Sequence, residues 1–472
     1  MTDLHFLSLC EMADAIRARR ISSLELIDAH VARIERLNPQ LNAYTYTDFD
    51  RARPQARAAD AAVRSVASSS LGSLHGVPIS MKSSIDVAGW PCECGSLLRR
   101  DYVAPADAPL VARLRAAGAI ILGNTNVPEF LMAWETDNSL HGRTNSPWDT
   151  HRTPGGSSGG EAAAVASGCS AGGIGSDGGG SIRVPSHFSG ICGLKPTPGR
   201  VPSTGHFPGS AGPFAQLGVV GPMARTVRDV ERLFEVVAGP DPGDPCAAPV
   251  PLRRWGDTEI RKLRVGYFLE HALAPATLET RGAVRKAADA LRSQGFEVVE
   301  WVPDNLDRAQ RLWANLFCRA GQMAFSPMLD GNDDRISPLF RQFRDAVQQQ
   351  PPLTATELLD TLLQRDVLRG QFLAKMEQFA ILLCPVAAIP AFRHGEREWI
   401  INERKVEYLD AMAYSAWFNL LGTPGAVVPV GRSPEGLPIG VQIVARPWEE
   451  EAALAIAAII EQASDGFRPP LA

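Results

Sequence analysis

The sequence has 472 residues, of which 45% are hydrophobic and 21% charged, and its formal net charge is −5 at pH 7. This composition is typical of an ordinary soluble globular protein with a large core. No basic stripe supplies the phosphate contacts that nucleic acid requires, so we expect no nucleic-acid partner.

The sequence predicts neither a targeting segment nor a membrane span. The first residues, MTDLHFLSLCEMADAI, contain acids at Asp3 and Glu11 and no basic segment ahead of an apolar core, unlike a signal peptide. The most apolar run, residues 379–390, is too short to span a bilayer and contains two prolines, so it is interpreted as a buried strand. The eight cysteines are scattered, which favours a reducing compartment. We therefore expect a cytoplasmic protein with no membrane partner.

Only one close cysteine pair, Cys92 and Cys94, raises the question of a metal. No second cysteine or histidine pair follows at the spacing that metal ligands usually show. The sequence therefore predicts no metal site.

Helices and strands alternate in the first part of the chain. Apolar residues recur at helical spacing over 9–37, where Ser22 or Ser23 is placed to cap a second helix. A further helix is predicted over 53–66, and a helix that feeds a short buried strand over 109–122.

Residues 75–87 alternate in the way a strand does, and Lys82 falls on the polar face. Pattern alone predicts that Lys82 faces solvent, because lysine is rarely fully buried. The apolar segment 127–134 fits plain core or a pocket wall.

The second half continues the alternation. Residues 193–200 are interpreted as a loop with prolines, residues 303–378 as mostly helical, and strands at 263–267 and 297–301 as a parallel pair that flanks a helix. The remaining predicted elements are a strand and helix over 219–237, strands over 425–430 and 439–444, and a helix over 449–463.

Glycine is concentrated between Pro154 and Pro185, where two short motifs compete. Residues 173–178 satisfy G-x-G-x-x-G, but no helix is expected directly after them and no acid lies about 20 residues on, so dinucleotide binding is disfavoured. Residues 155–159 and 156–160 satisfy G-x-S-x-G, yet the preceding WDTHRTP is not a buried strand. The downstream histidines that a Ser-His site would need sit in no recognisable setting: His187, His206, His271 and His394.

The whole stretch resembles the amidase signature family in order and spacing. The motifs that carry the resemblance are GGSSGGEAAAVA, GSDGGGSIRVP and GICGLKPTPGR, with HGVPISMKSSIDVAG, AGAIILGNTNVPEF, NSPWDTHRTPGGSSGG and LPIGVQIVARPWEE elsewhere. The similarity covers most of the chain outside about residues 250–400. It implies an α/β fold in which helices cover both faces of a central twisted mixed sheet. It also implies one domain over 1–472, with a variable, mostly helical region on the substrate side at about 250–400.

The resemblance implies a Ser-Ser-Lys triad and no metal or organic cofactor. It places the nucleophile on Ser181, the bridging serine on Ser157 after a cis peptide bond, and the lysine on Lys82. The backbone donors of the oxyanion hole would be Gly178, Gly179, Gly180 and Ser181. Supporting roles fall on Ser158, Asp177 and Arg183, and the acyl pocket on Leu131, Met132 and Trp134. Many relatives carry a side chain at Gly178, so a more flexible loop is expected in this chain.

The implied chemistry is physically consistent. A serine hydroxyl needs a neighbouring base, and a lysine can act as one only when it is neutral, which requires burial. The resemblance therefore reverses the expectation of an exposed Lys82. It implies hydrolysis of a small-molecule amide, and the same route also accommodates esters and carbamates. A homodimer is compatible with the resemblance. The alternative is the A subunit of a glutamine-dependent tRNA amidotransferase, which would need partner subunits.

Overall fold

A single large sheet organises the computed structural model, which describes residues 3–65, 67–209, 211–323 and 325–470. Eleven strands lie in the order β1-β3-β2-β4-β6-β5-β12-β13-β9-β7-β8. Their bounds are β1 Tyr44–Thr47, β2 Pro78–Lys82, β3 Ile120–Thr125, β4 Gly172–Asp177, β5 Cys192–Lys195, β6 Val219–Ala224, β7 Val265–Tyr267, β8 Val298–Glu300, β9 Ile381–Pro385, β12 Gly425–Arg432 and β13 Pro438–Ala445. A separate hairpin pairs β10 Glu398–Ile401 with β11 Arg404–Glu407.

The sheet is mixed. Strand β2 runs parallel to β3 and β4, and β7 runs parallel to β8 and β9, whereas the other pairings are antiparallel. The predicted parallel pair at 263–267 and 297–301 is confirmed as β7 and β8. The sheet also combines three strands from the region 250–400, which are β7, β8 and β9, with strands from before and after that region.

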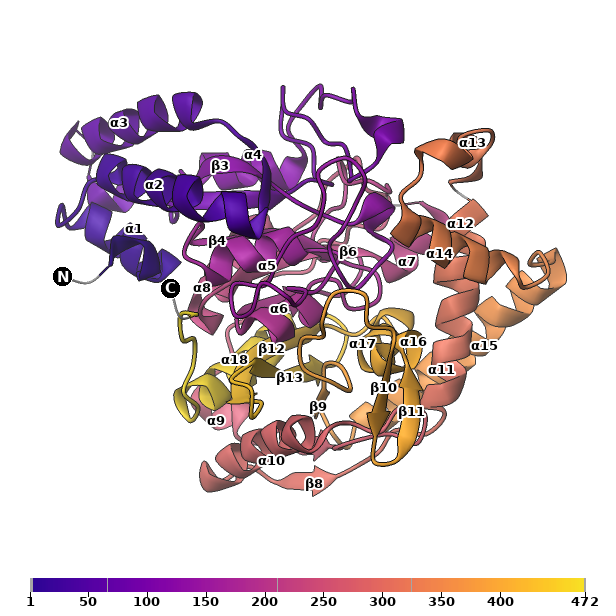
Figure 1. Cartoon of the computed structure of the whole chain (residues 1–472). Helices are drawn as coiled ribbons and strands as arrows, with labels where there is room; N and C mark the ends of the chain where they lie inside the picture. Colours follow the sequence, from indigo (N-terminus) through magenta and orange to yellow (C-terminus); the bar gives the residue numbers. More distant parts are fainter. Residues whose placement is uncertain (1–2, 66, 210, 324, 471–472) are drawn as a thin grey trace.

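Helices cover the sheet and its ends (Figure 1). The N-terminal helices and those of residues 306–376 lie at opposite sides of the molecule in this view. The helices are α1 Leu9–Arg17, α2 Ser23–Leu41, α3 Phe49–Ser65, α4 Pro109–Ala116, α5 Gly159–Ala166, α6 Arg183–Ser189, α7 Gly212–Leu217, α8 Val227–Val237, α9 Asp257–Ile260, α10 Leu278–Ser293, α11 Leu306–Trp313, α12 Gly321–Met323, α13 Ser326–Leu329, α14 Pro338–Gln348, α15 Ala355–Met376, α16 Tyr408–Ala411, α17 Ala413–Leu420 and α18 Glu450–Gln462.

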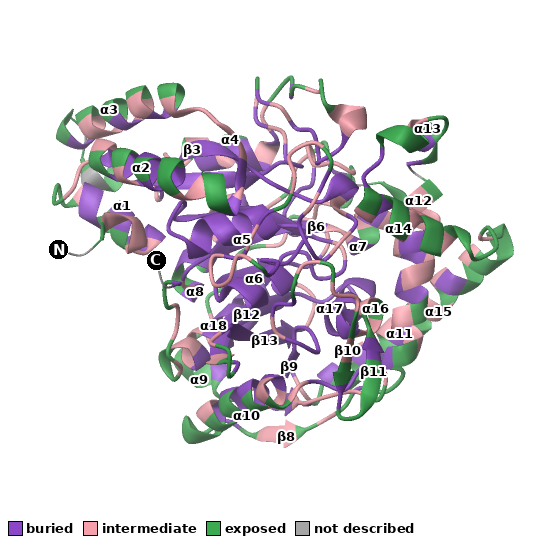
Figure 2. Cartoon of the chain, viewed as in Figure 1, coloured by how far each residue is buried: buried purple, intermediate pink, exposed green. Residues whose placement is uncertain are grey.

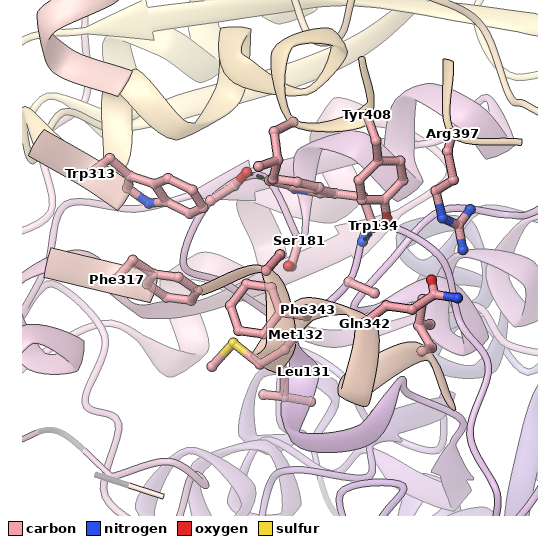
Figure 3. Close-up of a pocket in the computed structure, with 15 residues that line it drawn as sticks. Leu131, Met132, Trp134, Ser181, Trp313, Phe317, Gln342, Phe343, Arg397 and Tyr408 are labelled. Atoms are coloured by element: carbon pink, nitrogen blue, oxygen red, sulfur yellow. Dashed lines mark hydrogen bonds between the residues drawn. The ribbon is translucent and has the colours of Figure 1, made fainter. Parts of the chain in front are cut away.

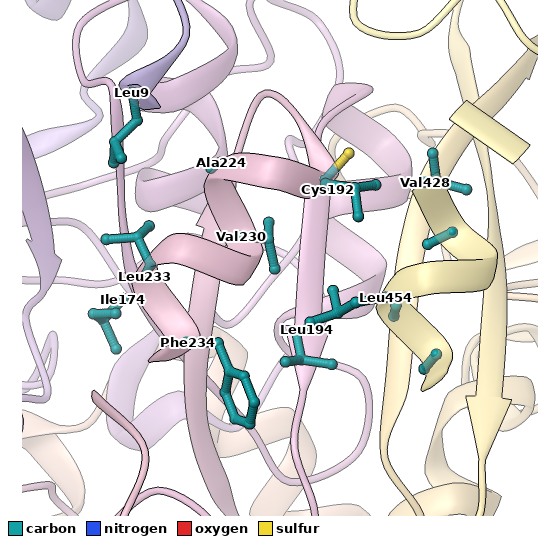
Figure 4. Packing of buried hydrophobic residues seen from close by; sticks show 14 of the residues in the cluster. Leu9, Ile174, Cys192, Leu194, Ala224, Val230, Leu233, Phe234, Val428 and Leu454 are labelled. Carbon is teal, nitrogen blue, oxygen red and sulfur yellow. The ribbon is translucent and has the colours of Figure 1, made fainter. Parts of the chain in front are cut away.

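Both faces of the sheet carry a hydrophobic core, which confirms the predicted fold class. Alternate strand residues belong to different clusters: Val428 belongs to the cluster that contains residues of α8 and α18 (Figure 4), whereas its neighbour Val427 belongs to the one that contains residues of α17. This alternation follows from the period of two along a strand. Helices α5 and α6 are buried along their whole length, while α3 and α15 expose one face (Figure 2).

Burial on both faces explains the position of Lys82. Strand β2 is an inner strand between β3 and β4, and all five of its residues are buried. Ile79 and Met81 enter the cluster that contains α1 and α8, while Ser80 points toward Glu161 of α5. Because helices cover both faces of this sheet, the polar face of β2 packs against a helix and not against water. The solvent-facing position that the pattern alone predicted for Lys82 is therefore wrong.

The predicted cap of the second helix is confirmed. Ser22 caps α2 in a capping box with Glu25, as the spacing predicted.

Two expectations about local structure are wrong. The segment 193–200 begins inside a strand, since β5 ends at Lys195, and a helix does follow the glycine run, since α6 begins at Arg183. The helix predicted over 53–66 is α3, except for residue 66, which lies outside the described residues.

No helix in the described part of the chain combines the length and the apolar character that crossing a bilayer requires.

Candidate active site

Lys82, the last residue of β2, lies in a cluster of three serines. Its Nζ is 2.7 Å from Ser157 Oγ, 2.8 Å from Ser158 Oγ and 2.9 Å from Ser176 Oγ. Ser157 and Ser158 precede α5, and Ser176 belongs to β4, the strand beside β2. The Gly156–Ser157 peptide bond is cis, as the resemblance implied. The structure thus brings together three expected residues and adds Ser176.

The surroundings of Lys82 favour its neutral form. The side chain is fully buried, and this burial lowers the pKa of the Lys82 amine to about 7, although Asp177 and Glu161 oppose the shift. A substantial share of the amine is therefore neutral near pH 7, with a lone pair that can take a proton.

Glu161 of α5 lies on the same side of the sheet as Lys82. Its carboxyl accepts hydrogen bonds from Ser80 Oγ at 2.5 Å and Thr125 Oγ1 at 2.9 Å. Burial raises the pKa of Glu161 to about 7, and its charge interacts with that of Lys82. Proton uptake in this region is therefore shared between two buried groups.

The loop between β4 and α6 is fixed through its carbonyl groups. Asn419 Nδ2 donates to Asp177 O at 3.1 Å, Trp313 Nε1 donates to Gly178 O at 2.8 Å, and Trp134 Nε1 donates to Gly179 O at 2.9 Å. The C=O and N–H groups of one trans peptide point in opposite directions. By holding each carbonyl, these three side-chain donors therefore also fix the direction of the N–H group of the next residue.

The amides of this loop divide into two groups. Gly180 N–H donates to Asp177 Oδ1 at 2.7 Å, so it is occupied within the protein, unlike the donor that the resemblance implied. The amides of Gly178, Gly179 and Ser181 make no hydrogen bond within the described residues. These three are the candidate donors for an oxyanion.

The loop is also closely covered. A Cβ added at Gly178 would lie 2.4 Å from the Phe317 ring, and one added at Gly179 would lie 2.5 Å from the Trp313 ring. The Phe317 ring thus occupies the space that a side chain at position 178 would fill. The Phe317 and Trp313 rings cover the loop, and Trp313 and Trp134 hold its carbonyl groups, while the greater flexibility expected at Gly178 stays a prediction.

Asp177 and Arg183 form a fully buried ion pair beneath the loop. Arg183 Nε and Nη2 donate to the two carboxylate oxygens at 3.0 and 2.9 Å, and Arg183 also bonds Gln442 and Asn419. The same carboxylate accepts the backbone N–H groups of Gly180, Ile182 and Arg183. Although burial opposes it, Arg183 holds the pKa of Asp177 well below its usual range. This pair fixes the turn that presents Ser181.

Ser181 stands at the boundary of two pockets. A cavity of about 180 Å³ is lined by Ser181 and by aromatic and aliphatic side chains (Figure 3). All three residues expected in the acyl pocket line it: Leu131, Met132 and Trp134. A smaller cavity of about 40 Å³ is lined by Ser181 together with Ser157 and Ser176. Ser181 Oγ makes no hydrogen bond to any residue that the structure describes.

His187 and His206 make no hydrogen bond to Ser181 in the described structure. His187 is buried, and its ring nitrogens lie at hydrogen-bond distance from Gly440 N and Ile389 O. His206 lines the smaller cavity, where its Nδ1 lies 3.0 Å from Pro208 O and burial lowers its pKa to about 4. A ring whose pKa lies near 4 is a weak general base at neutral pH, which disfavours His206 as the base of a Ser-His site.

Three residues of the site escaped sequence interpretation. Ser176 directly precedes Asp177, yet no spacing linked it to Lys82, because β2 and β4 meet only in the sheet. Trp313 and Asn419 lie more than 100 residues beyond the loop that they hold. Asn419 belongs to a helix, and Trp313 to the region without recognisable motifs, so nothing local indicated either role.

This geometry occurs in a chain with well-defined relatives. A family model described as Amidase matches residues 25–454. The A subunit of the glutamyl-tRNA(Gln) amidotransferase from Roseiflexus sp. (strain RS-1) is 36% identical over 490 residues, covering 98% of this chain and 98% of the relative. The indoleacetamide hydrolase of Bradyrhizobium diazoefficiens is 35% identical over 469 residues, covering 96% of this chain and 86% of the relative.

A solved structure agrees with these sequence matches. A bacterial aryl acylamidase superposes with a TM-score of 0.86 at 27% identity, and the match covers 98% of this chain and 97% of that one. The similarity therefore extends over nearly the whole chain, including the region 250–400 that carries none of the motifs behind the resemblance.

Proposed function

We propose a reaction for this chain from the premise that it belongs to the Amidase family, whose model matches most of its length. The proposed activity is hydrolysis of a carboxylic amide through an acyl-enzyme on Ser181, with Ser157 as proton relay and Lys82 as base. Esters and carbamates fit the same acyl-enzyme route. The observation that carries the proposal is the fully buried Lys82 amine, 2.7 Å from Ser157 Oγ.

The hydrogen-bond directions around Lys82 support the relay. Ser158 Oγ lies 3.2 Å from Ser176 O, so its own hydrogen is donated there and it accepts from Lys82. A neutral amine has two hydrogens, which Ser158 and Ser176 accept. Its lone pair is then left to accept the hydroxyl hydrogen of Ser157. Ser157 Oγ is in turn free to accept the hydrogen of Ser181.

The proton path accounts for both halves of the reaction. As Ser181 Oγ forms its bond to the substrate carbon, its proton passes to Ser157, whose own proton passes to Lys82. Collapse of the tetrahedral intermediate breaks the C–N bond, and the proton returns through Ser157 to the leaving nitrogen. A water molecule then attacks the acyl-enzyme by the same path and releases the carboxylic acid. The link from Ser157 to Ser181 belongs to the substrate-bound state, since catalytic hydrogen bonds often tighten only then.

Charge on the substrate oxygen would be stabilised by the loop. The unoccupied N–H groups of Gly178, Gly179 and Ser181 form a run of donors next to the nucleophile. Loss of one such donor in other hydrolases costs about 2.7–4 kcal/mol in the barrier. The buried Asp177–Arg183 pair keeps this run in place.

A second candidate is the A subunit of a glutamine-dependent tRNA amidotransferase, favoured by the 36% identity to its counterpart from Roseiflexus. Glutamine carries an ammonium and a carboxylate, which need charged partners when buried. The one charged side chain among those that line the larger cavity is Arg397, and it already pairs with Glu135 at 2.7 Å. This lining favours a small-molecule amidase.

The experiment is labelling with a fluorophosphonate probe, followed by an amide hydrolysis screen of the purified chain. We expect label on Ser181, loss of label and activity in Ser181→Ala, and turnover without partner subunits. Absence of label with the native chain would contradict a serine nucleophile. Glutaminase activity that appears only with copurified subunits would support the second candidate instead.

A further inference from the structure

We propose, on the basis of the function above, that this site is specific for primary amides of uncharged acids whose acyl group is about as large as one aromatic ring. The inference comes from the division of space around Ser181. One side is a larger aromatic cavity, and the other is a smaller cavity whose lining mixes serines with apolar side chains. Their sizes and linings restrict the two halves of the substrate separately.

The position of Ser157 decides which half enters which cavity. In the proposed relay, Ser157 delivers the proton to the leaving nitrogen, so the leaving group must lie on its side of Ser181. Ser157 and Ser176 line the smaller cavity, whereas the larger one is lined by Ser181 without them. The acyl group therefore occupies the larger cavity, and the leaving amine occupies the smaller one.

The smaller cavity restricts the leaving group to ammonia or a very small amine. Its volume is about 40 Å³, and a single water requires roughly 10–15 Å³ on this measure, so the cavity has room for about three water molecules. Its wall includes Phe130 and Phe214, which are buried in an aromatic cluster with Phe325 and cannot swing aside without disrupting it. An N-phenyl group has no room there, which favours an unsubstituted amide nitrogen.

The larger cavity restricts the acyl group. It measures about 180 Å³, and an engineered apolar cavity of roughly 150 Å³ in another protein binds benzene. Trp313 stacks on Phe317 with ring centroids 5.0 Å apart, and Trp134 lies 5.5 Å from Tyr408. These ring faces and edges suit another aromatic ring. One ring with a short linker fills the space, whereas a biphenyl or a long alkyl chain exceeds it.

Charge is excluded from the acyl group by the same lining. Arg397 and Gln342 lie together on the side of the cavity away from Trp313 and Phe317 in Figure 3. The Arg397 guanidinium pairs with Glu135 and lies 5.1 Å from the Tyr408 ring centre. The Glu135 carboxylate already neutralises Arg397, so a substrate carboxylate would meet no uncompensated positive charge there, and a substrate ammonium would meet no carboxylate among the lining residues.

The first experiment measures kcat/KM of the purified chain for a panel of amides in which either the acyl group or the leaving amine is varied. Phenylacetamide is compared with its N-methyl and N-phenyl derivatives, and with the primary amides 4-biphenylacetamide, dodecanamide and glutamine. We expect phenylacetamide to exceed each of the others at least tenfold. Equal or faster hydrolysis of the N-phenyl, biphenyl, dodecanoyl or glutamine substrate would overturn the corresponding part of the inference.

The second experiment tests the assignment of the cavities with a pair of wall variants. Phe343→Ala enlarges the larger cavity, and Val219→Ala enlarges the smaller one. We expect Phe343→Ala to raise kcat/KM for 4-biphenylacetamide about tenfold relative to that for phenylacetamide, without changing the preference for an unsubstituted nitrogen. Val219→Ala should raise kcat/KM for the N-methyl amide and leave the preference among acyl groups unchanged. The reverse pattern would show that the cavities are assigned the wrong way round. Thermal melting confirms that both variants are folded.

Failure of this inference differs from failure of the proposed function. If the native chain neither reacts with a fluorophosphonate at Ser181 nor hydrolyses any amide, the proposed function itself is wrong. If Ser181 reacts and larger or charged amides are preferred, the function stands and the proposed substrate class is wrong.

Discussion

Lys82 Nζ lies 2.7 Å from Ser157 Oγ although 75 residues separate them in the chain. The contact exists because an inner strand ends where the turn before α5 begins, in a part of the sheet covered on both faces. Burial supplies what a serine–lysine relay needs, since a lysine in water would be fully protonated at neutral pH.

Replacement of Lys82 by methionine removes the base and keeps the shape of the buried side chain. We expect kcat/KM to fall by about 10²–10⁴, which is the usual contribution of a general base. Thermal melting should show a folded protein, because an apolar side chain suits a fully buried position. His206→Asn is the matched variant and should retain most of the activity. An active Lys82→Met together with an inactive His206→Asn would favour the Ser-His alternative.

The pH dependence of kcat/KM should report the titration of Lys82. Burial lowers the pKa of its amine to about 7, and only the neutral form accepts a proton. The rate should therefore rise with pH and level off above about 7, falling about tenfold per pH unit on the acid side. Glu161→Gln removes a negative charge that favours the protonated amine, so it should move the midpoint to lower pH. A midpoint unchanged by Glu161→Gln would contradict this coupling.

Trp313→Phe should slow the reaction by weakening the hold on the oxyanion loop. The variant keeps a ring but loses the N–H that donates to Gly178 O at 2.8 Å. One hydrogen bond contributes about 0.5–1.5 kcal/mol, so we expect kcat to fall about three- to tenfold, while the smaller ring in the wall of the larger cavity also raises KM. Affinity for a trifluoromethyl ketone, which forms an oxyanion, should fall in parallel. Trp417→Phe is the control, because the buried Trp417 indole N–H bonds no group among the described residues. Equal effects of both variants would indicate a purely structural role.

Arg183→Met should destabilise the fold strongly. It leaves the Asp177 carboxylate buried without its cation, a change that typically costs about 3–5 kcal/mol. The free energy of unfolding in urea measures the loss. The control is Arg292→Met, since Arg292 and Asp289 form a pair whose side chains are 41% and 69% exposed. That substitution should change stability by less than about 1 kcal/mol. Comparable losses in the two variants would contradict the role of the buried pair.

The local elements were predictable wherever the pattern depends on neighbouring residues. The capped start of α2, the alternation of β2 and the hairpin of β12 and β13 follow from capping, the period of two and turn residues. The short strand β5 and the helix α6 were missed, because glycine and proline suggested irregular structure there. Tertiary contacts such as the pairing of β5 with β6 and β12 override those local preferences.

The family resemblance, the fold class and the residues of the glycine-rich loop could be predicted from the amino-acid sequence, because they depend on motifs that are contiguous in the chain. The burial of Lys82, its contact with Ser176 and the hydrogen bonds of Trp313 and Trp134 to the loop carbonyls became visible only in the folded chain. The reason is physical: the pKa of a lysine and the direction of a peptide N–H depend on groups brought close by the sheet and its covering helices. Sequence spacing does not record those distances.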